Sequence, residues 1–323
     1  MREVIARAPV RIDFGGGWTD VPPYTMERGG CVCNLAISLY ARATLRPCAR
    51  GVGVEIAADG DAALAAAALR RGGVDGVRLE QSCDFPRGAG LGGSSAAGVA
   101  ATAAIAAWRR ECVEPDTLAE RSRALEVEEL GIAGGYQDHY AAAYGGALAL
   151  HFGEHTTVRR IPLSDELVEQ LEQRCIVAYT GESRISGETI TAVLDAYRDG
   201  VPRVVDALAR MRELAESMID ALEHADLDRL GSLVREHWEH QRSLHEKITT
   251  PSIERILAAA EESGAIGGKA LGASGGGCVV VIAPESRAEA VRERMSALAR
   301  VLSFRVDRMG ARVLDSERGT WQS

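Results

Sequence analysis

The glycine-rich stretch over residues 86–96 constrains the fold of this chain more than any other segment. Four glycines lie within the six residues from Gly88 to Gly93, and two serines follow directly. A strand is predicted before the stretch, over residues 77–85, and an alanine-rich helix after it, over residues 96–110. Glycine lets the backbone approach a ligand closely, and the free N–H groups of a helix start favour anions. The pattern therefore predicts a phosphate-binding loop whose hydroxyls can reach a metal ion.

Other interpretations of this stretch are weaker but distinct. A plain glycine turn with a serine helix cap would need no ligand. The spacing Gly88-x-Gly90-x-x-Gly93 also fits the dinucleotide-binding pattern, but that pattern needs a strand after the helix, and a second helix is predicted there, over residues 115–130. A Walker loop fails because Lys269 is followed by alanine and not by serine or threonine.

Charge restricts how this chain can hold an anion. It has 37 basic and 46 acidic side chains, a net charge of −9 and a pI near 5.4. This balance argues against a nucleic-acid binder or a binder of anionic membranes, since either needs a cationic face. Lys247 and Lys269 are the only lysines. A bound phosphate must therefore be held by a local arrangement of N–H groups.

Length and composition bound the domain organisation. Glycine accounts for 35 of 323 residues, against about 7% in an average protein. With no G-X-Y period and 46% apolar residues, the chain is neither collagen-like nor disordered. The length suits two domains of about 150 residues. We place them at residues 1–165 and 166–323, where a strand-rich pattern gives way to a helix-rich one.

The cysteines and the N-terminus indicate a reduced compartment. The seven cysteines are scattered and form no C-x-x-C pair, which argues against a disulfide framework or a zinc site. The N-terminus does not resemble a signal peptide. Residues 88–108 carry no charge, but they contain only three large aliphatic side chains and would insert poorly into a bilayer. We expect a cytoplasmic protein.

The sequence predicts mainly strands near the N-terminus and mainly helices in the second half of the chain. Strands dominate the first 60 residues, and the apolar stripe from Val204 to Leu222 predicts a core-facing helix. His237 and His240 share one predicted helix, but no third metal ligand has suitable spacing, so a surface or substrate-lining role is favoured. Further helices are expected over residues 61–71, 186–197, 226–247, from 251 and over 285–301, and strands over 147–152, 156–163, 278–283, 304–308 and 312–314.

Three more glycine-bearing segments lie far from the loop in sequence. They are RAPVRIDFGGGWTDVPPY at residues 7–24, GGYQDHYAAAYGG at 134–146 and SGAIGGKALGASGGG at 263–277. With the loop at 86–96, these segments in this order resemble the GHMP kinase superfamily over essentially the whole chain. Together with AYTGESRIS at 178–186, they are most similar to the branch that contains D-glycero-D-manno-heptose 7-phosphate kinases and L-fucokinases.

The resemblance implies an α+β fold of two domains with the active site between them. The N-terminal domain would resemble ribosomal protein S5, and the C-terminal domain would be ferredoxin-like. ATP and Mg²⁺ would be the cofactors. The metal would be held by Ser95 and Glu126, with Glu128 as the fallback, because the family places an acid five residues before Gly131. The implied ATP-binding residues are Pro86, Gly88, Gly90, Leu91, Gly92, Gly93, Ser94, Ser95 and Lys269.

The resemblance also implies the residues that act on the substrate. Asp138 would face the reacting hydroxyl, either as a base or only to orient it, with Arg11 beside it. Ser274 departs from the family, which more often has glycine there. From the residues alone, two plainer readings stay open: Lys269 could lie on a helix end, and Arg11 could pair with Asp13 or Asp20 at the surface. The implied substrate-binding residues are Arg11, Gly15, Gly16, Gly17, Thr19, Asp20, Asp138, Tyr179, Arg184, Gly275, Gly276 and Gly277.

The implied activity is ATP-dependent phosphorylation of the anomeric hydroxyl of a sugar. D-glycero-D-manno-heptose 7-phosphate or a related heptose or octose phosphate is the leading substrate. Another small-molecule kinase of the superfamily, acting for example on L-fucose, arabinose or galactose, is the alternative, and a sensor that binds without turnover is a third reading. The expected partners are the small-molecule substrate and ATP, without nucleic acid or membrane. The sequence is compatible with a homodimer but does not determine the oligomeric state.

Overall fold

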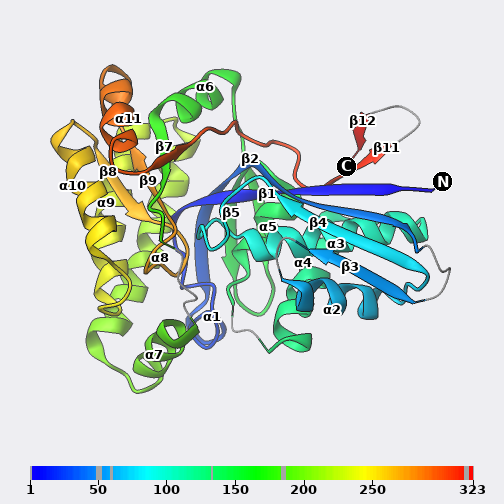
Figure 1. Cartoon of the computed structure of the whole chain (residues 1–323). Coiled ribbons are helices and arrows are strands. Elements are labelled where there is room, and N and C mark those ends of the chain that lie inside the picture. Colours follow the sequence, from blue (N-terminus) through cyan, green and yellow to red (C-terminus); the bar gives the residue numbers. More distant parts are fainter. Residues whose placement is uncertain are drawn as a thin grey trace.

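A large sheet of eight strands forms one end of the molecule (Figure 1). The computed structural model describes residues 2–48, 53–58, 61–131, 134–182, 187–315 and 320–322. The long strand β2 is central to the sheet and pairs with β1, β4 and β5. The strands are β1 (Val4–Gly15), β2 (Gly30–Pro47), β3 (Val54–Ala58), β4 (Val77–Cys83), β5 (Ala147–Phe152), β6 (Thr157–Ile161), β11 (Arg312–Asp315) and β12 (Thr320–Gln322).

Helices pack on this sheet and position the predicted phosphate loop. The alanine-rich helix α3 (Gly93–Arg109) begins at the end of that loop and is buried against β1 and β2. Small alanine side chains let it lie close to the sheet. The helix α4 (Pro115–Ala124) follows and passes directly into a π-helical turn, η1 (Leu125–Glu129). The other helices here are α1 (Tyr24–Arg28), α2 (Ala62–Gly72) and α5 (Gln137–Tyr144).

A second, four-stranded sheet lies at the other end of the molecule, among the later helices (Figure 1). Its strand order is β10-β7-β9-β8, and all three pairings are antiparallel. Its strands are β7 (Cys175–Tyr179), β8 (Gly267–Ala270), β9 (Cys278–Ile282) and β10 (Arg300–Leu302). The helices are α6 (Asp165–Arg174), α7 (Gly187–Arg198), α8 (Pro202–Glu223), α9 (Leu227–Ser243), α10 (Pro251–Glu262), η2 (Glu285–Arg287) and α11 (Ala288–Ser296).

Helix α8 connects the two cores. The apolar stripe predicted from Val204 to Leu222 is buried. Its first half, including Val204 and Leu208, belongs to the core of the second sheet. Its second half, including Met218 and Leu222, belongs to the core of the first sheet. One amphipathic helix therefore fixes the relative position of the two halves.

The mixed α+β fold is confirmed, and the absence of a strand between α3 and α4 agrees with the rejection of a dinucleotide-binding fold. Two expectations are wrong. The helix over 285–301 ends at Ser296, and residue 301 lies in β10. Residues 304–308 form only one bridge, between Val306 and Ile37. Residues 267–270, for which the sequence predicted no element, form strand β8, because they pair with β9.

The two sheets come from the two halves of the chain except at the C-terminal end. The strands of the second sheet all follow residue 165, and the domain division at 165/166 stays a prediction. Strands β11 and β12, however, return to the first sheet, where β11 pairs with β1. Within the described ranges, no helix is long and apolar enough to cross a membrane.

Candidate active site

The predicted phosphate loop lines the larger of two adjoining cavities. This cavity has a volume of about 620 Å³, and residues 86–90 and 92–95 form one wall of it. Helix α3 starts at Gly93, so the first N–H groups of the helix lie at the cavity. Gly92 has a φ of 75°, and a Cβ there would lie 2.9 Å from Cγ of Asp138. Only glycine permits this approach of the loop to α5. Leu91 is buried and does not line the cavity.

The far end of this cavity is apolar. Leu64, Phe85 and Ala97 line it beside the glycines. Such a surface suits a flat heterocycle at the end of a phosphate chain. Arg87 is the one cation among the described lining residues, and it is exposed. Sequence reasoning did not single out Arg87 because nothing distinguishes it from the many other arginines.

Ser95 and Glu126 come together at the base of the loop, as predicted. Ser95 Oγ lies 3.4 Å from both carboxylate oxygens of Glu126. The π-helical turn η1 adds one residue to the helix at this point and directs Glu126 inward. Glu128 instead lies at the surface, where it accepts a hydrogen bond of 2.8 Å from Arg71. The structure thus favours Glu126 over the fallback.

His139 holds the Glu126 carboxylate in place. His139 Nε2 lies 3.2 Å from Glu126 Oε2, and its Nδ1 lies 3.0 Å from Ser122 Oγ. Burial raises the pKa of Glu126, but the contact with His139 and the hydroxyls of Ser94 and Ser95 outweigh burial and lower that pKa overall. Glu126 is therefore held as a carboxylate. Its partner His139 escaped sequence reasoning because the contact spans two elements.

A smaller cavity of about 170 Å³ adjoins the first. Gly134, Gly135 and Asp138 line both cavities, so Asp138 lies at their junction. The other described residues of the small cavity are Arg11, Asp13, Gly17, Trp18, Asp20, Val21, Gln137, Ile190, Gly272 and Ala273. The segments 7–20, 134–140 and 267–278, which the sequence connected only by resemblance, therefore meet here.

Arg11 fixes Asp138 against the phosphate loop. Its Nε donates to Asp138 Oδ1 at 2.8 Å, and its Nη1 donates to the Gly90 carbonyl at 2.7 Å. Arg11 is buried, so the surface pairing with Asp13 or Asp20 is wrong. Burial raises the pKa of Asp138, and the charge of Arg11 opposes this only in part. A carboxylate with a raised pKa is a better proton acceptor.

Asp20 is the most perturbed acid of the small cavity. Its Oδ2 accepts a hydrogen bond of 3.0 Å from the Gln137 N–H. Burial raises its pKa to about 7, the Gln137 hydrogen bond opposes the shift, and the charges of Asp138 and Asp13 add to it. Asp20 therefore holds a proton over much of the acidic range while its neighbours remain paired.

Lys269 lies on strand β8. It is not at a helix end, and it does not line the larger cavity. Its Nζ donates to Asp13 Oδ2 at 2.9 Å, and both side chains are buried. Burial lowers the pKa of Lys269, while Asp13 opposes that shift. This placement does not support the predicted contact with ATP. Asp13 itself was missed, because no local signal reveals a partner 256 residues away.

Hydrogen bonds to buried side chains hold the glycine turn at residues 15–17. Only Gly17 of the three lines the cavity. Thr19 is fully buried, and its hydroxyl bonds the Gly16 and Cys31 carbonyls, so its side chain is used inside the turn. Gly16 N donates to His237 Nε2 at 2.9 Å. His237 is therefore a buried acceptor, and its expected surface or substrate-lining role is wrong.

The C-terminal glycine loop contacts the phosphate loop rather than the small cavity. Cys278 N donates to the Ala89 carbonyl at 2.7 Å, and a Cβ on Gly277 would lie 2.8 Å from that same oxygen. The cavity is lined instead by Gly272 and Ala273, not by residues 275–277. Ser274 has a φ of 70°, and its Oγ accepts from Gln241 Nε2 at 3.0 Å, which accommodates this departure from glycine.

Two further residues were predicted to bind the substrate. Tyr179 ends β7 and lines neither cavity. Arg184 lies outside the described residues. The site therefore consists of a phosphate loop, a serine–carboxylate pair and a polar cavity that meet at one aspartate.

Comparison with known proteins identifies the family. The model for the GHMP kinases N terminal domain matches residues 60–146, and the model for GHMP kinases C terminal matches residues 218–300. The chain belongs to the GHMP kinase family. The phosphate loop, Glu126 and Asp138 all lie within the N-terminal match. As a member of this family the chain is an ATP-dependent phosphotransferase.

Several relatives resemble the chain over most of its length. D-glycero-alpha-D-manno-heptose 7-phosphate kinase of Campylobacter jejuni is 27% identical, covering 86% of this chain and 88% of the relative. A bifunctional fucokinase/GDP-fucose pyrophosphorylase of Arabidopsis thaliana is 26% identical over 91% of this chain, which spans only 31% of that protein. The crystal structure of a D-glycero-D-manno-heptose 1-phosphate kinase from Bacteroides thetaiotaomicron superposes with a TM-score of 0.78 at 25% identity, covering 96% and 98% of the two chains.

The site fits the cofactors that this family implies. Ser95 and Glu126 offer only oxygen ligands, which is what Mg²⁺ prefers. Because Gly92 has no Cβ, the loop lies against Asp138 beside the N–H groups that open α3, and such N–H groups favour phosphates. A nucleotide with its phosphates at the loop and its base at the apolar end would occupy the larger cavity.

The Lys269–Asp13 pair makes a testable contribution to stability. Replacing Lys269 by Met leaves Asp13 buried without a counter-charge, so we expect the free energy of unfolding to fall by about 3–5 kcal/mol. The double variant Lys269→Met/Asp13→Asn should lose less than the two single losses together. Urea unfolding measures both. Arg210→Met, which breaks an exposed pair with Glu236, serves as the control and should cost under about 1 kcal/mol. Additive losses at Lys269 and Asp13 would contradict the pairing.

Asp20 should make stability depend on pH. Its folded-state pKa of about 7 lies above its ordinary value of 3.8, so its contribution is complete below pH 4 and is lost as the pH rises to 7. Relative to wild type, Asp20→Asn should therefore gain roughly 2–3 kcal/mol between pH 5 and pH 8. Urea unfolding at several pH values measures this. Asp206→Asn, on the exposed side of α8, is the control. Parallel profiles for wild type and Asp20→Asn would refute the assignment.

Proposed function

We propose that the chain transfers the γ-phosphoryl group of ATP to the anomeric hydroxyl of a sugar. D-glycero-D-manno-heptose 7-phosphate, or a related heptose or octose phosphate, is the first candidate substrate. One observation carries the proposal: a nucleotide-sized cavity and a small polar cavity meet at Asp138. A hydroxyl in the small cavity would face the end of a phosphate chain in the larger one.

The small cavity suits a ligand rich in hydroxyl groups. Asp13 Oδ1 and Gln137 Oε1 are buried and have no hydrogen-bond partner among the described residues. Both residues line the cavity. Buried acceptors without a partner cost free energy unless a ligand supplies donors. The hydroxyls of a sugar would satisfy both, whereas a purely apolar ligand would not.

The residues of the chain have separate roles in this proposal. The N–H groups of the loop and of the start of α3 would bind the phosphates, and Ser95 and Glu126 would hold Mg²⁺, which supplies charge neutralisation at the phosphates. Asp138 would accept or orient the proton of the reacting hydroxyl. Arg11 would keep Asp138 in position through its bond to Gly90. The chemistry then depends mainly on positioning, as phosphoryl transfer requires.

L-Fucose is the second candidate substrate. Its support is the similarity to the Arabidopsis fucokinase/GDP-fucose pyrophosphorylase and to an L-fucokinase/L-fucose-1-P guanylyltransferase of Bacteroides fragilis, which is 29% identical over 90% of this chain. Unlike L-fucose, the heptose phosphate already carries a phosphate group before the reaction.

ATP turnover on a panel of sugars tests the proposed reaction. The panel contains heptose 7-phosphate, L-fucose, arabinose and galactose, with mevalonate as a non-sugar control, all with Mg²⁺. We expect one sugar to be used with the highest kcat/KM and the new phosphate to appear at the anomeric carbon by ³¹P NMR. Phosphate on a non-anomeric hydroxyl, or turnover with mevalonate alone, would contradict the proposal.

Asp138→Asn separates catalysis from binding. The amide oxygen can still accept from Arg11 Nε, so the local geometry is retained, but the proton acceptor is lost. We expect kcat to fall by about 10²–10⁴-fold while ATP binding changes little. Steady-state kinetics and nucleotide titration measure the two effects. Asp206→Asn is the matched control. Unchanged kcat in Asp138→Asn would remove Asp138 from the mechanism.

A further inference from the structure

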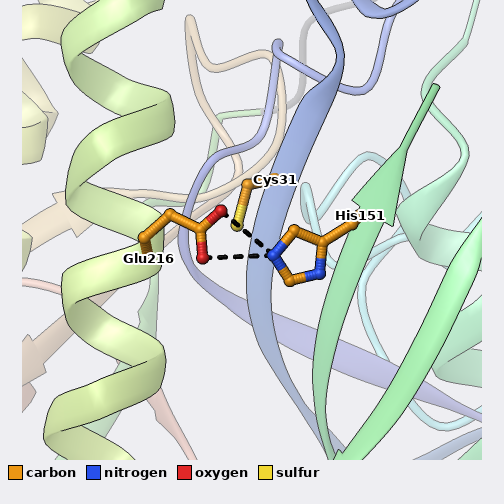
Figure 2. Close-up of side chains that lie close together, drawn as sticks. All are labelled: Cys31, His151 and Glu216. Atoms are coloured by element: carbon orange, nitrogen blue, oxygen red, sulfur yellow. Dashed lines mark hydrogen bonds and ion pairs between the residues drawn. The ribbon is translucent and has the colours of Figure 1, made fainter.

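Three potential metal ligands gather on the first sheet, apart from both cavities. Figure 2 shows Cys31 of β2, His151 of β5 and Glu216 of α8 pointing toward one another. None of the three lines either cavity described above. The activity proposed for the chain uses none of them.

The fold itself brings these side chains together. Cys31 and His151 lie directly opposite each other in the antiparallel pair of β2 and β5. Opposite residues project from the same face of a sheet, with their Cβ atoms about 5 Å apart. Helix α8 packs on β2 and brings Glu216 over this face. The position of all three residues is therefore fixed by strand register and helix packing, without a metal ion.

The distances suit a single small cation. His151 Nε2 lies 3.0 and 3.1 Å from the two carboxylate oxygens of Glu216. One ligand atom from each of the three residues lies within 4.8 Å of the others. Tetrahedral coordination at ordinary zinc bond lengths places ligand atoms about 3.3–3.6 Å apart. Small side-chain rotations would thus bring all three onto one ion.

The ligand types select the metal. Sulfur, imidazole nitrogen and carboxylate oxygen together are typical of zinc sites, whereas Mg²⁺ prefers oxygen alone. The Cys31 side chain is buried, while His151 and Glu216 are 40% and 46% exposed. The ion would therefore have its thiolate ligand on the protein side and a fourth position open to water. Burial and the Glu216 carboxylate raise the pKa of the Cys31 thiol, and Arg212 opposes this only in part, so the ion itself would have to displace the thiol proton.

We propose that Cys31, His151 and Glu216 form a Zn²⁺-binding site. The scattered cysteines argued against a zinc site in the sequence, because the three ligands come from elements that are far apart along the chain. A bound ion would join β2, β5 and α8. It would lie close to the glycine turn at residues 15–17, since the Cys31 backbone both accepts from and donates to the hydroxyl of Thr19, which follows that turn. The site would then stabilise the start of β2, which the Thr19 hydroxyl contacts.

Metal titration of the whole chain tests the site. Protein stripped with a chelator is titrated with ZnCl₂ by calorimetry, and Co²⁺ is used as a spectroscopic probe. We expect one equivalent of Zn²⁺ per chain, a thiolate-to-cobalt charge-transfer band in the near ultraviolet, and no displacement by excess Mg²⁺. Zinc in excess should also raise the melting temperature.

Variants assign the ligands. Cys31→Ser should abolish the cobalt charge-transfer band, and His151→Gln and Glu216→Gln should each weaken Zn²⁺ binding by more than about tenfold. Cys112→Ser, which removes an exposed free thiol, is the control and should change nothing. His151 and Glu216 are half exposed, so their variants remain informative if Cys31→Ser fails to fold. No stoichiometric binding, or binding that survives both His151→Gln and Glu216→Gln, would overturn the proposal.

Discussion

The buried guanidinium of Arg11 is the interaction on which the geometry of the active site depends. It belongs to β1, yet it bonds both the Gly90 carbonyl in the phosphate loop and the Asp138 carboxylate on α5. Its backbone N–H also donates to the Leu91 carbonyl at 3.1 Å. A guanidinium can hold two acceptors in a fixed fork, which a lysine cannot do. The loop and the carboxylate are thus set relative to each other before any ligand binds.

The phosphate loop is also fixed by the second half of the chain. Cys278, at the start of β9, donates to the Ala89 carbonyl, and the carbonyl of Leu271 lies where a side chain on Gly90 would be. Helix α8 contributes to both cores and holds the two sheets in this relation. The active site therefore depends on the docking of the two halves, and its glycines are required where backbone meets backbone.

Local patterns predicted the elements and the loop, and resemblance supplied most of the site. The glycines before an alanine-rich helix were sufficient to predict the phosphate loop, because that signal is contained in ten residues. Glu126 could not be separated from Glu128, since the π-helical turn that orients them has no sequence signature. Lys269 was assigned to ATP only through the family resemblance. Its partner Asp13 lies on another sheet, and only tertiary structure shows that the pair is internal.

Three aspartates line the small cavity, and their negative charges would repel one another if all three were ionised and unpaired. Each aspartate has a different environment that reduces this repulsion. Asp13 is paired with Lys269, Asp138 is paired with Arg11, and Asp20 has a pKa raised to about 7 by burial. The described lining of the cavity is therefore close to neutral, and its one cation, Arg11, is already bonded. Such a lining offers hydrogen-bond acceptors to the hydroxyl groups of a sugar, but it offers no unpaired positive charge to the phosphate of a sugar phosphate. The cavity thus favours the hydroxyl-bearing end of a sugar, and the phosphate of a heptose phosphate would have to extend beyond the described walls.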